Sequence, residues 1–336
     1  MQSRKKVLFV CKRGSEYGFS SGLKKSSGLY NSARFVSEAI STGKIHALTI
    51  EVIDNNDIDR WVTFYKPDMV ILEALWVVPS KIRVLKHLHP YVKWYCHLHS
   101  NIPFLSAEGV AMKWLAEYQE LDVGVVSNSL KAAKALRIAL GKAIYLPNIY
   151  PGSHMKWNGG AGNYLDVACF GAIRPMKNQL TQAIAAIGYA RSIGVPLRFH
   201  INHTRVETQG ENALKNLRSL FLETENAELV EHPWMEHDHF LELLTRMDIG
   251  MQVSMSETFN IVTADMVSVG LPVVVSKEID WVSPFCQVDE SDAKAIMERM
   301  WWVDGNPILT LINKIRLKNY SLKAKARWIS FIGTNG

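Results

Sequence analysis

The chain has 336 residues and a formal net charge of +6, and its apolar content of 48% can fill the cores of two ordinary domains, which excludes a disordered chain. Its four cysteines lie far apart and form no C-x-x-C pair, which argues against a disulfide scaffold or a zinc site and fits a reducing cytoplasm. No apolar stretch approaches the roughly eighteen residues that a spanning helix needs, so we expect a soluble, cytoplasmic protein.

The first half of the chain alternates short apolar runs with amphipathic stretches. Residues 6–11 predict a buried strand, and a Gly/Ser-rich loop over residues 14–28 precedes a helix expected at residues 31–40. Further strands are expected at residues 48–53, 69–72, 92–98, 123–127 and 144–146. Strands separated by helices predict a parallel sheet that is covered on both faces.

The second half repeats this pattern. Strands are expected at residues 167–172, 197–201, 227–230, 249–253 and 273–276. Clustered glycines and a proline between residues 150 and 163 predict a linker between the halves. We therefore expect a doubly wound domain at residues 1–152, a second at residues 163–318, and a helix at residues 319–336. Ligands in such sheets bind at the carboxyl ends of the strands.

The most informative segment is residues 254–274, which reads SMSETFNIVTADMVSVGLPVV. A helix that begins just after Phe259 would direct several N–H groups and its positive dipole end at an anion such as a diphosphate. Two carboxylates, Glu257 and Asp265, lie eight positions apart around this helix start. The plain alternative is a capping carboxylate at Glu257 and a solvated helical charge at Asp265.

This segment resembles the donor-site signature of the retaining GT-B glycosyltransferases of family four. In that family a strand ends in Ser-x-x-Glu, a second acid follows eight positions on, and Gly-x-Pro-Val-Val begins the next strand. The resemblance implies that Glu257 binds donor-sugar hydroxyls and that Asp265, where the family usually has Glu, binds the ribose. It implies a donor-binding set of Glu257, Thr258, Phe259, Asn260, Ile261 and Asp265.

A second segment, FGAIRPMKN at residues 170–178, resembles the strand, loop and helix that open the donor domain of the same family. Lys177 matches a lysine that contacts the donor diphosphate. Ala172 stands where the family has an arginine, and Arg174, two residues on, is the candidate replacement. The alternative for Lys177 is a surface residue at a helix start, where the dipole disfavours a cation.

In the first domain, Ser27, Gly28 and Asn31 belong to a stretch that resembles the Gly-rich loop of these enzymes, which approaches the donor phosphates or the acceptor. His97 and His99 share one side of a strand end. Similar enzymes carry a histidine there that faces the reacting sugar, and His99 is the candidate because it lies nearer the carboxyl end. A hydrogen-bonded core histidine is the alternative. The other histidines form no compact ligand set, so we expect no metal site.

The C-terminal segment has Ala324, Trp328, Phe331 and Ile332 on one helical face. It resembles the terminal helix that crosses back to the N-domain in this fold, and a plain packing helix is the alternative. Together these resemblances imply an α/β protein of the GT-B class, with two Rossmann-like doubly wound domains facing across a cleft.

The implied activity is a retaining hexosyl- or pentosyltransferase that uses a nucleotide-diphosphate sugar, expected to be a UDP-sugar. Lys177, Arg174 and the helix start near Asn260 would stabilise the departing diphosphate electrostatically, so no metal or other cofactor is required. Glu257 and Lys177 are the expected catalytic residues of the donor side. His99 would act with them by positioning the sugar rather than as a base.

The acceptor is suggested by a looser resemblance to phage-encoded glycosyltransferases at residues 52–59, 72–79 and 99–104. Some of these modify hydroxymethylated bases in phage DNA, which would place the protein in the host cytoplasm. DNA phosphates could be contacted by basic pairs expected in or beside loops at or near the cleft, Lys5/Lys6, Lys12/Arg13 and Lys24/Lys25. A saccharide or lipid-linked acceptor, a non-catalytic nucleotide-sugar binder and an epimerase of the same fold remain as alternatives.

Overall fold

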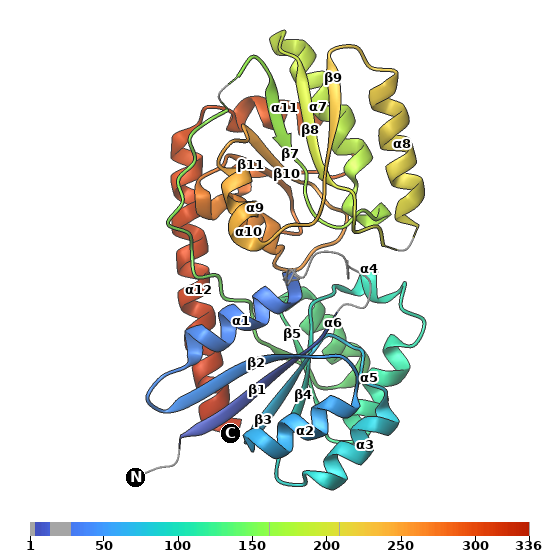
Figure 1. Ribbon diagram of the computed structural model, residues 1–336, viewed down its shortest axis with the longest axis vertical. Coiled ribbons are helices and arrows are strands. Elements are labelled where there is room, and N and C mark those ends of the chain that lie inside the picture. Colours follow the sequence, from blue (N-terminus) through green and yellow to red (C-terminus); the bar gives the residue numbers. More distant parts are fainter. Residues whose placement is uncertain (1–3, 14–27, 161, 208, 336) are drawn as a thin grey trace. The chain divides into compact units, whose positions relative to one another are not determined.

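The structure, a computed structural model, describes residues 4–13, 28–160, 162–207 and 209–335 (Figure 1). The chain forms two compact units, one made of Met1–Pro151 with Tyr320–Gly336 and one made of Gly152–Asn319. Each unit has its own six-stranded sheet. The long helix α12 (Pro307–Asn335) starts within the second unit and ends within the first.

The first unit contains a sheet in the order β2-β1-β3-β4-β5-β6, and all neighbouring strands are parallel. Its strands are β1 (Lys5–Lys12), β2 (Ile45–Val52), β3 (Met69–Glu73), β4 (Lys93–Leu98), β5 (Gly124–Ser127) and β6 (Ile144–Tyr145). Its helices are α1 (Gly28–Ile40), α2 (Asn56–Tyr65), α3 (Pro79–Leu88), α4 (Ile102–Leu105), α5 (Ala111–Glu120) and α6 (Leu130–Leu140). The expected alternation of strands and helices is confirmed.

Both faces of this sheet are buried, because successive side chains of each strand point to opposite faces and nearly all of them are apolar. Leu8 and Val10 of β1 pack into one core with Leu72 and Trp94. Val7 and Phe9 pack into the core on the other face. Trp328 of α12 is fully buried in that second core, where its indole lies 5.6 Å from the Phe9 ring and donates to the carbonyl oxygen of Pro147 at 2.8 Å. The apolar face recognised in the C-terminal sequence therefore covers the sheet of the first unit.

The second unit contains a parallel sheet in the order β12-β11-β10-β7-β8-β9. Its strands are β7 (Leu165–Ala168), β8 (Leu197–Asn202), β9 (Ala227–His232), β10 (Ile249–Gln252), β11 (Val273–Ser276) and β12 (Gln287–Val288). Its helical elements are η1 (Pro175–Lys177), α7 (Gln179–Ile193), α8 (Gly210–Leu222), α9 (His237–Leu244), α10 (Ile261–Val269), η2 (Pro284–Cys286), α11 (Ala293–Val303) and the start of α12. The central strands β7, β10 and β11 are buried at every residue, as continuous apolar runs predict.

Several local expectations differ from the structure, and one is that the helix expected at residues 319–336 already begins at Pro307. The strand expected at residues 167–172 ends at Ala168, because the chain turns at Gly171, whose φ is +119°. The basic pair Lys5/Lys6 lies at the amino end of β1, whereas Lys12 is the last residue of β1 and Arg13 follows it. Parallel strands present their loops at the carboxyl edge, so Lys5 and Lys6 are not beside the loops where a ligand is expected. Lys24 and Lys25 lie outside the described residues.

Among the described helices, none combines the length and the apolar character that crossing a membrane requires.

Candidate functional site

The segments that follow β7 and β10 in the second unit are joined by hydrogen bonds. The backbone N–H of Met255 donates to Met176 O at 2.9 Å, and the side-chain amide of Asn178 donates to Val253 O at 3.1 Å. Gln182 accepts from the N–H of Val253 at 2.9 Å. Both segments follow the carboxyl ends of adjacent strands, so the order of strands in the sheet places the two predicted donor motifs side by side.

Lys177 and Glu257 meet where these two segments touch. The Lys177 ammonium donates to Oε1 of Glu257, and both side chains are about nine-tenths buried, with exposed fractions of 11% and 8%. The Gln182 amide donates to Lys177 O at 2.8 Å and fixes the backbone of the lysine. A buried ammonium beside a carboxylate provides one donor for an anion and one acceptor for hydroxyl groups.

Helix α10 begins directly after this pair, as expected. Asn260 caps it, because its side-chain oxygen accepts from the N–H of Thr263 at 2.9 Å. The Asn260 amide donates to Gln252 Oε1 at 2.9 Å, and its φ of +55° lies in the left-handed region, which Asn tolerates better than most residues. The helix start is thus fixed from two sides, and its first turn carries the N–H groups and dipole that favour an anion.

The residues around the cap are held by an aromatic pair. Trp281 Nε1 donates to Phe259 O at 2.7 Å, and the two ring centroids lie 5.6 Å apart. Thr258 is half-buried between Glu257 and Phe259, and Ile261 is the first residue of α10. The predicted donor residues from Glu257 to Ile261 therefore form one ordered turn at the end of β10.

Asp265 is buried and bound to a histidine. Its Oδ1 contacts Nε2 of His237 at 2.8 Å, and the exposed fraction of its side chain is 4%. The alternative of a solvated helical charge is therefore wrong. His237 is the first residue of α9, and sequence analysis missed its role because 28 residues separate it from Asp265.

Arg174 forms an ion pair with an acidic residue, Glu207. Its guanidinium donates to Glu207 Oε2 at 2.9 Å, and Arg205 donates to Glu207 Oε1 at 2.8 Å. Burial raises the pKa of Glu207, but Arg205 and Arg174 lower it more, so its pKa lies below the usual range. Ala172 is buried, and its carbonyl oxygen accepts from Gln179 at 2.9 Å.

The backbone of Gly171 lies close to the side chain of Lys177. Its N–H donates to Asn202 Oδ1 at 3.0 Å, and its φ of +119° is one that side-chain-bearing residues rarely adopt. A Cβ at this position would lie 3.9 Å from Lys177 Cε. The glycine thus permits the turn that carries the chain from β7 toward Lys177.

Three buried hydroxyls surround the start of α10. The side-chain oxygens of Ser254, Ser256 and Thr263 are buried, and within the described part of the chain they have no hydrogen-bond partner. Buried polar groups are normally satisfied by protein or by water. This loop is therefore unusually polar for its burial.

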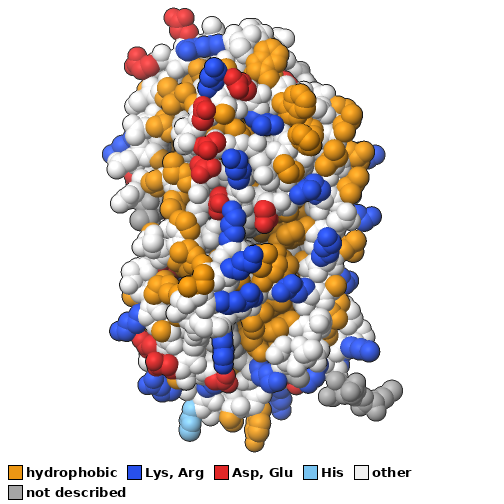
Figure 2. Space-filling view, turned by 180° about the vertical axis from the view of Figure 1, so that it is seen from behind, with side chains coloured by type: hydrophobic (Ala, Val, Ile, Leu, Met, Phe, Trp, Pro, Cys, Tyr) orange, Lys and Arg blue, Asp and Glu red, His pale blue; other side chains and the backbone are white. Residues whose placement is uncertain are grey.

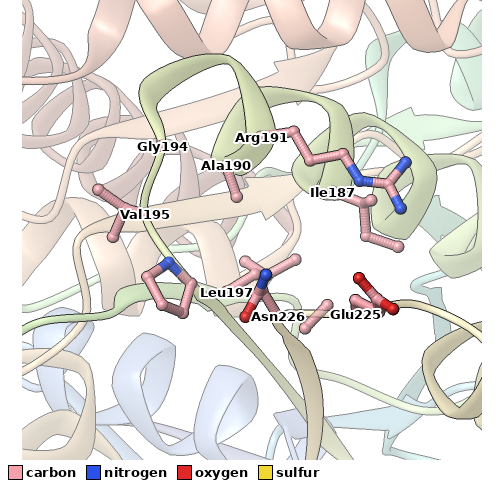
Figure 3. Close-up of a pocket in the computed structure, with 10 residues that line it drawn as sticks. Ile187, Ala190, Arg191, Gly194, Val195, Leu197, Glu225 and Asn226 are labelled. Atoms are coloured by element: carbon pink, nitrogen blue, oxygen red, sulfur yellow. The ribbon is translucent and has the colours of Figure 1, made fainter.

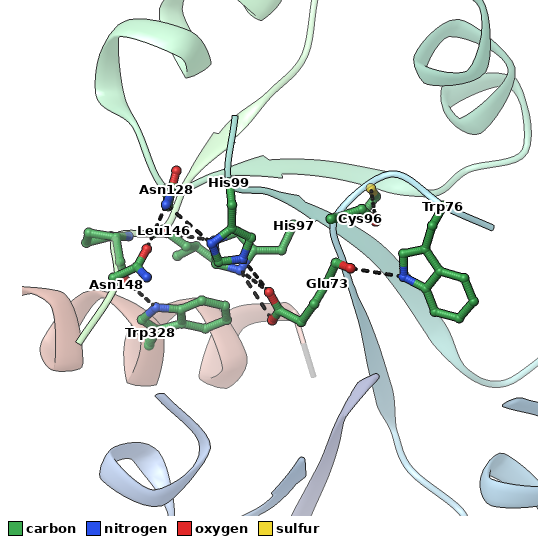
Figure 4. A network of polar contacts seen from close by, with 11 residues as sticks. Glu73, Trp76, Cys96, His97, His99, Asn128, Leu146, Asn148 and Trp328 are labelled. Atoms are coloured by element: carbon green, nitrogen blue, oxygen red, sulfur yellow. Dashed lines mark hydrogen bonds and ion pairs between the residues drawn. The ribbon is translucent and has the colours of Figure 1, made fainter. Parts of the chain in front are cut away.

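In the first unit, a buried carboxylate joins the two candidate histidines (Figure 4). Glu73 ends β3, and its Oε2 lies 3.2 Å from His97 Nδ1 and 2.5 Å from His99 Nε2. His97 Nε2 donates to Leu146 O at 3.2 Å, and His99 Nδ1 lies 3.4 Å from the amide nitrogen of Asn128. His97 is thus the more enclosed of the pair, as expected.

The hydrogen-bond partners in this cluster indicate which ring nitrogens carry hydrogen. A carbonyl oxygen can only accept, so His97 donates from Nε2 to Leu146 O. His99 donates from Nε2 to Glu73 and accepts at Nδ1 from the Asn128 amide. Burial raises the pKa of Glu73, but the two histidines lower it to about 2. Burial, with repulsion from His97, lowers the pKa of His99, and Glu73 offsets this only in part.

One ligand atom from each of Glu73, His97 and His99 lies within 4.8 Å of the others, a grouping that can also hold a metal ion. Two ligands of one tetrahedral zinc ion lie about 3.3 Å apart, given bonds of about 2.0 Å. The His99–Glu73 contact of 2.5 Å is too short for this and is a hydrogen bond. The three side chains therefore do not fit an ion as they stand.

The remaining predicted residues lie in the first unit. Gly28 begins α1, and Asn31 is buried in the first turn of that helix, so these two residues are helical rather than part of a loop. Ser27 lies outside the described residues.

A cavity of about 430 Å³ lies at the other end of the second unit's sheet (Figure 3). Leu197 begins β8 and Ala227 begins β9, so the cavity is at the amino ends of these strands. It is also lined by Ile187, Ala190, Arg191, Gly194, Val195, Pro196, Glu225 and Asn226. The cavity is therefore separate from the Lys177–Glu257 loops.

No protein-family model matches the chain, and a search of curated proteins finds no significant match. Solved structures do match. TarM of S. aureus, solved with UDP, aligns over 79% of this chain and 55% of its own at 12% identity and a TM-score of 0.61. HepE of Anabaena, solved with UDP and glucose, aligns over 98% of both chains at 12% identity and a TM-score of 0.66. Sucrose-phosphate synthase of Thermosynechococcus elongatus aligns over 98% of both at 13% identity and 0.69.

The chain spans about half the length of TarM but nearly all of the other two. Two parallel six-stranded sheets, each with helices on its faces, and these alignments identify the fold as GT-B, with two Rossmann-like domains. The expected fold class is confirmed. At these identities the likeness concerns the fold.

Proposed function

We propose that the chain is a retaining glycosyltransferase that moves a sugar from a UDP-sugar to an acceptor hydroxyl. The observation that carries this proposal is the buried Lys177–Glu257 pair at the start of α10. It combines a cation, the N-terminus of a helix and a hydroxyl acceptor in one loop, which is what a sugar bound to a diphosphate requires. The likeness to folds solved with UDP supports the choice of donor.

In the proposed reaction the bond from the anomeric carbon to the diphosphate oxygen breaks, and a bond to the acceptor oxygen forms on the same face of the sugar. Lys177 and the N-terminus of α10 stabilise the negative charge of the departing diphosphate. Glu257 orients the donor sugar by accepting from its hydroxyls, and the leaving phosphate takes the acceptor proton. This charge stabilisation needs no metal or other cofactor.

Asp265 and His99 have supporting roles in the proposal. Asp265 accepts from the ribose, with His237 holding its carboxylate in place. Arg174 adds positive charge next to the diphosphate in place of the arginine absent at Ala172. His99, oriented by Glu73 and Asn128, positions the reacting sugar.

Hydroxymethylcytosine in DNA is the acceptor to be tested first. The support is the looser resemblance of the first domain to phage-encoded enzymes and the exposed Lys12 and Arg13 at the carboxyl end of β1. These cations suit phosphate contacts, and a base in a duplex would have to be flipped out to react. Saccharides and lipid-linked sugars are the other acceptors, and a non-catalytic binder of nucleotide sugars is the alternative to an enzyme.

The decisive measurement is release of nucleoside diphosphate from UDP-, GDP- and ADP-sugars, alone and with hydroxymethylcytosine DNA, saccharides or lipid-linked sugars. We expect release from a UDP-sugar that rises with one acceptor, and a product whose anomeric NMR coupling matches that of the donor. Release from no donor, with UDP still bound, would leave only a binder.

Variants locate the site. Glu257→Gln and Lys177→Ala should each lower turnover at least a hundredfold. The matched control is the exposed pair Lys294 and Glu298, 3.9 Å apart in the same unit, whose Lys294→Ala and Glu298→Gln variants should retain full activity. Unchanged turnover in Glu257→Gln would remove the donor-site assignment.

A further inference from the structure

The C-terminal helix carries a net positive charge with no acidic residue in it. Residues 307–336 contain six Lys and Arg and no Asp or Glu, and the net charge of the whole chain is +6. The rest of the chain therefore has as many acids as bases. Nearly all of this segment is the single helix α12.

Helix α12 has two apolar faces. One is buried and includes Leu309, Leu317, Ala324, Trp328 and Ile332. The other is exposed and consists of Ile308, Leu311, Ile315 and Leu322, whose exposed fractions are 67%, 59%, 50% and 57%. At 3.6 residues per turn, these four residues fall within a sector of about 60°. We call them the α12 stripe. Single exposed leucines are ordinary, whereas an exposed row of four along one helix face is not.

Cations lie along both sides of the α12 stripe. By the same helical geometry, Lys318 and Lys325 flank it on one side and Lys323 on the other. Lys318 and Lys323 are exposed. Within the described part of the chain, no cation of α12 has a carboxylate within 4.0 Å. Among the described residues, these charges therefore have no acidic partner.

Two tryptophans precede the helix. Trp301 and Trp302 lie at the end of α11, three residues before α12 begins, and about half of each side chain is exposed. Figure 2 shows apolar side chains exposed among Lys and Arg side chains on one face of the molecule. Tryptophan is the residue that favours the boundary between water and acyl chains.

We propose that the outer face of α12 binds an anionic lipid surface, with the helix lying in the plane of the interface. The α12 stripe would enter the boundary between headgroups and acyl chains, and the flanking lysines would extend to the lipid phosphates. Two other occupants fit less well. A second copy on this face would bring two sets of uncompensated cations together, and nucleic acid would leave the apolar stripe in water.

The test is cosedimentation of the full chain with vesicles of phosphatidylcholine alone and of phosphatidylcholine with 30% phosphatidylglycerol. We expect binding to the anionic vesicles at 100 mM salt and at least tenfold weaker binding to the neutral ones. Two variants separate the contributions, Leu311→Gln/Ile315→Gln for the stripe and Lys318→Glu/Lys323→Glu/Lys325→Glu for the charges. Each should weaken binding at least tenfold.

The matched control is Ile138→Gln/Leu222→Gln, which removes two apolar side chains outside α12 that are more exposed than those of the stripe, and it should bind like the wild type. Gel filtration with light scattering, and a shift assay with duplex DNA, complete the test. The proposal is overturned if the wild type does not sediment, if the stripe variant binds vesicles normally, or if the stripe instead mediates a dimer. It is also overturned if only DNA binding depends on the lysines. No sugar transfer is measured, so these outcomes are independent of the proposed function.

Discussion

The Lys177 ammonium donates to the Glu257 carboxylate across 80 residues of sequence. The contact exists because β7 and β10 are neighbours in the sheet, so that the segments following their carboxyl ends touch. Each side chain is largely buried, so each charge is stabilised by the other in place of water. In the proposed enzyme the same two groups bind opposite parts of the donor.

We expect the Lys177–Glu257 pair to contribute both to folding stability and to UDP binding. Variants can measure the two contributions separately. Lys177→Met removes the cation beside a buried carboxylate, and we expect a loss of about 3 kcal/mol in the free energy of unfolding. Adding Glu257→Gln should recover part of that loss, because the buried charge is then gone as well. Urea unfolding measures both values. Affinity for UDP, measured by calorimetry, should fall at least tenfold in Lys177→Met and stay low in the double variant. Recovery of UDP binding in the double variant would contradict a direct role of Lys177.

The cap of α10 can be tested with a pair of substitutions. Asn260→Ala loses the cap and must hold Ala at a φ of +55°, so we expect a cost of about 2 kcal/mol. Asn260→Gly loses the side-chain contacts but accepts that φ, and its cost should be smaller. Thermal or urea unfolding compares them. Equal costs would show that the backbone conformation of residue 260 contributes nothing.

Arg174 and Arg205 both contact Glu207, which makes them a matched pair. If Arg174 replaces the guanidinium absent at Ala172, Arg174→Ala should weaken UDP binding about tenfold, and the effect should shrink at high salt. Arg205→Ala removes a partner of the same carboxylate and should leave UDP binding unchanged. Equal effects of the two variants would mean that Arg174 affects UDP binding only through its contact with Glu207.

Glu73 should make the stability of the first unit depend on pH in the acidic range. Its pKa is lowered from 4.5 to about 2 when folded, so its stabilising contribution is complete above about pH 4.5 and is lost as the pH falls toward 2. Glu73→Gln should be less stable than the wild type at pH 7, and the difference should shrink between pH 4.5 and pH 2. Urea midpoints across this range measure it, with Glu298→Gln as the control. A difference that stays constant with pH would contradict a charged, histidine-bound Glu73.

The segment from Ser254 to Val274 shows what could be predicted locally. Its polar start, capping Asn260 and following apolar residues are enough to predict a helix start at the end of a strand, and α10 begins one residue after Asn260. The order of strands and helices was predictable for the same reason, because the period of the apolar residues reflects which side of each element is buried. The early end of β7 was not, because it depends on the backbone conformation at Gly171.

The partners of the site residues could not be found this way. Glu73 was visible only as an acid that ends an apolar run, and its contact with His99 depends on β3 lying next to β4. His237 and Glu207 gave no local signal at all, since each meets its partner from a distant part of the chain.

The sequence by itself determined the two-part α/β architecture, the helix start at the proposed donor site, and the absence of acidic residues among the cations after residue 307. Only the tertiary structure decided which charges meet and which face of α12 is exposed on the protein. The physical reason is that periodicity and capping act within a few residues of the chain. Ion pairs and burial are instead settled by strand order, which brings together residues far apart in sequence.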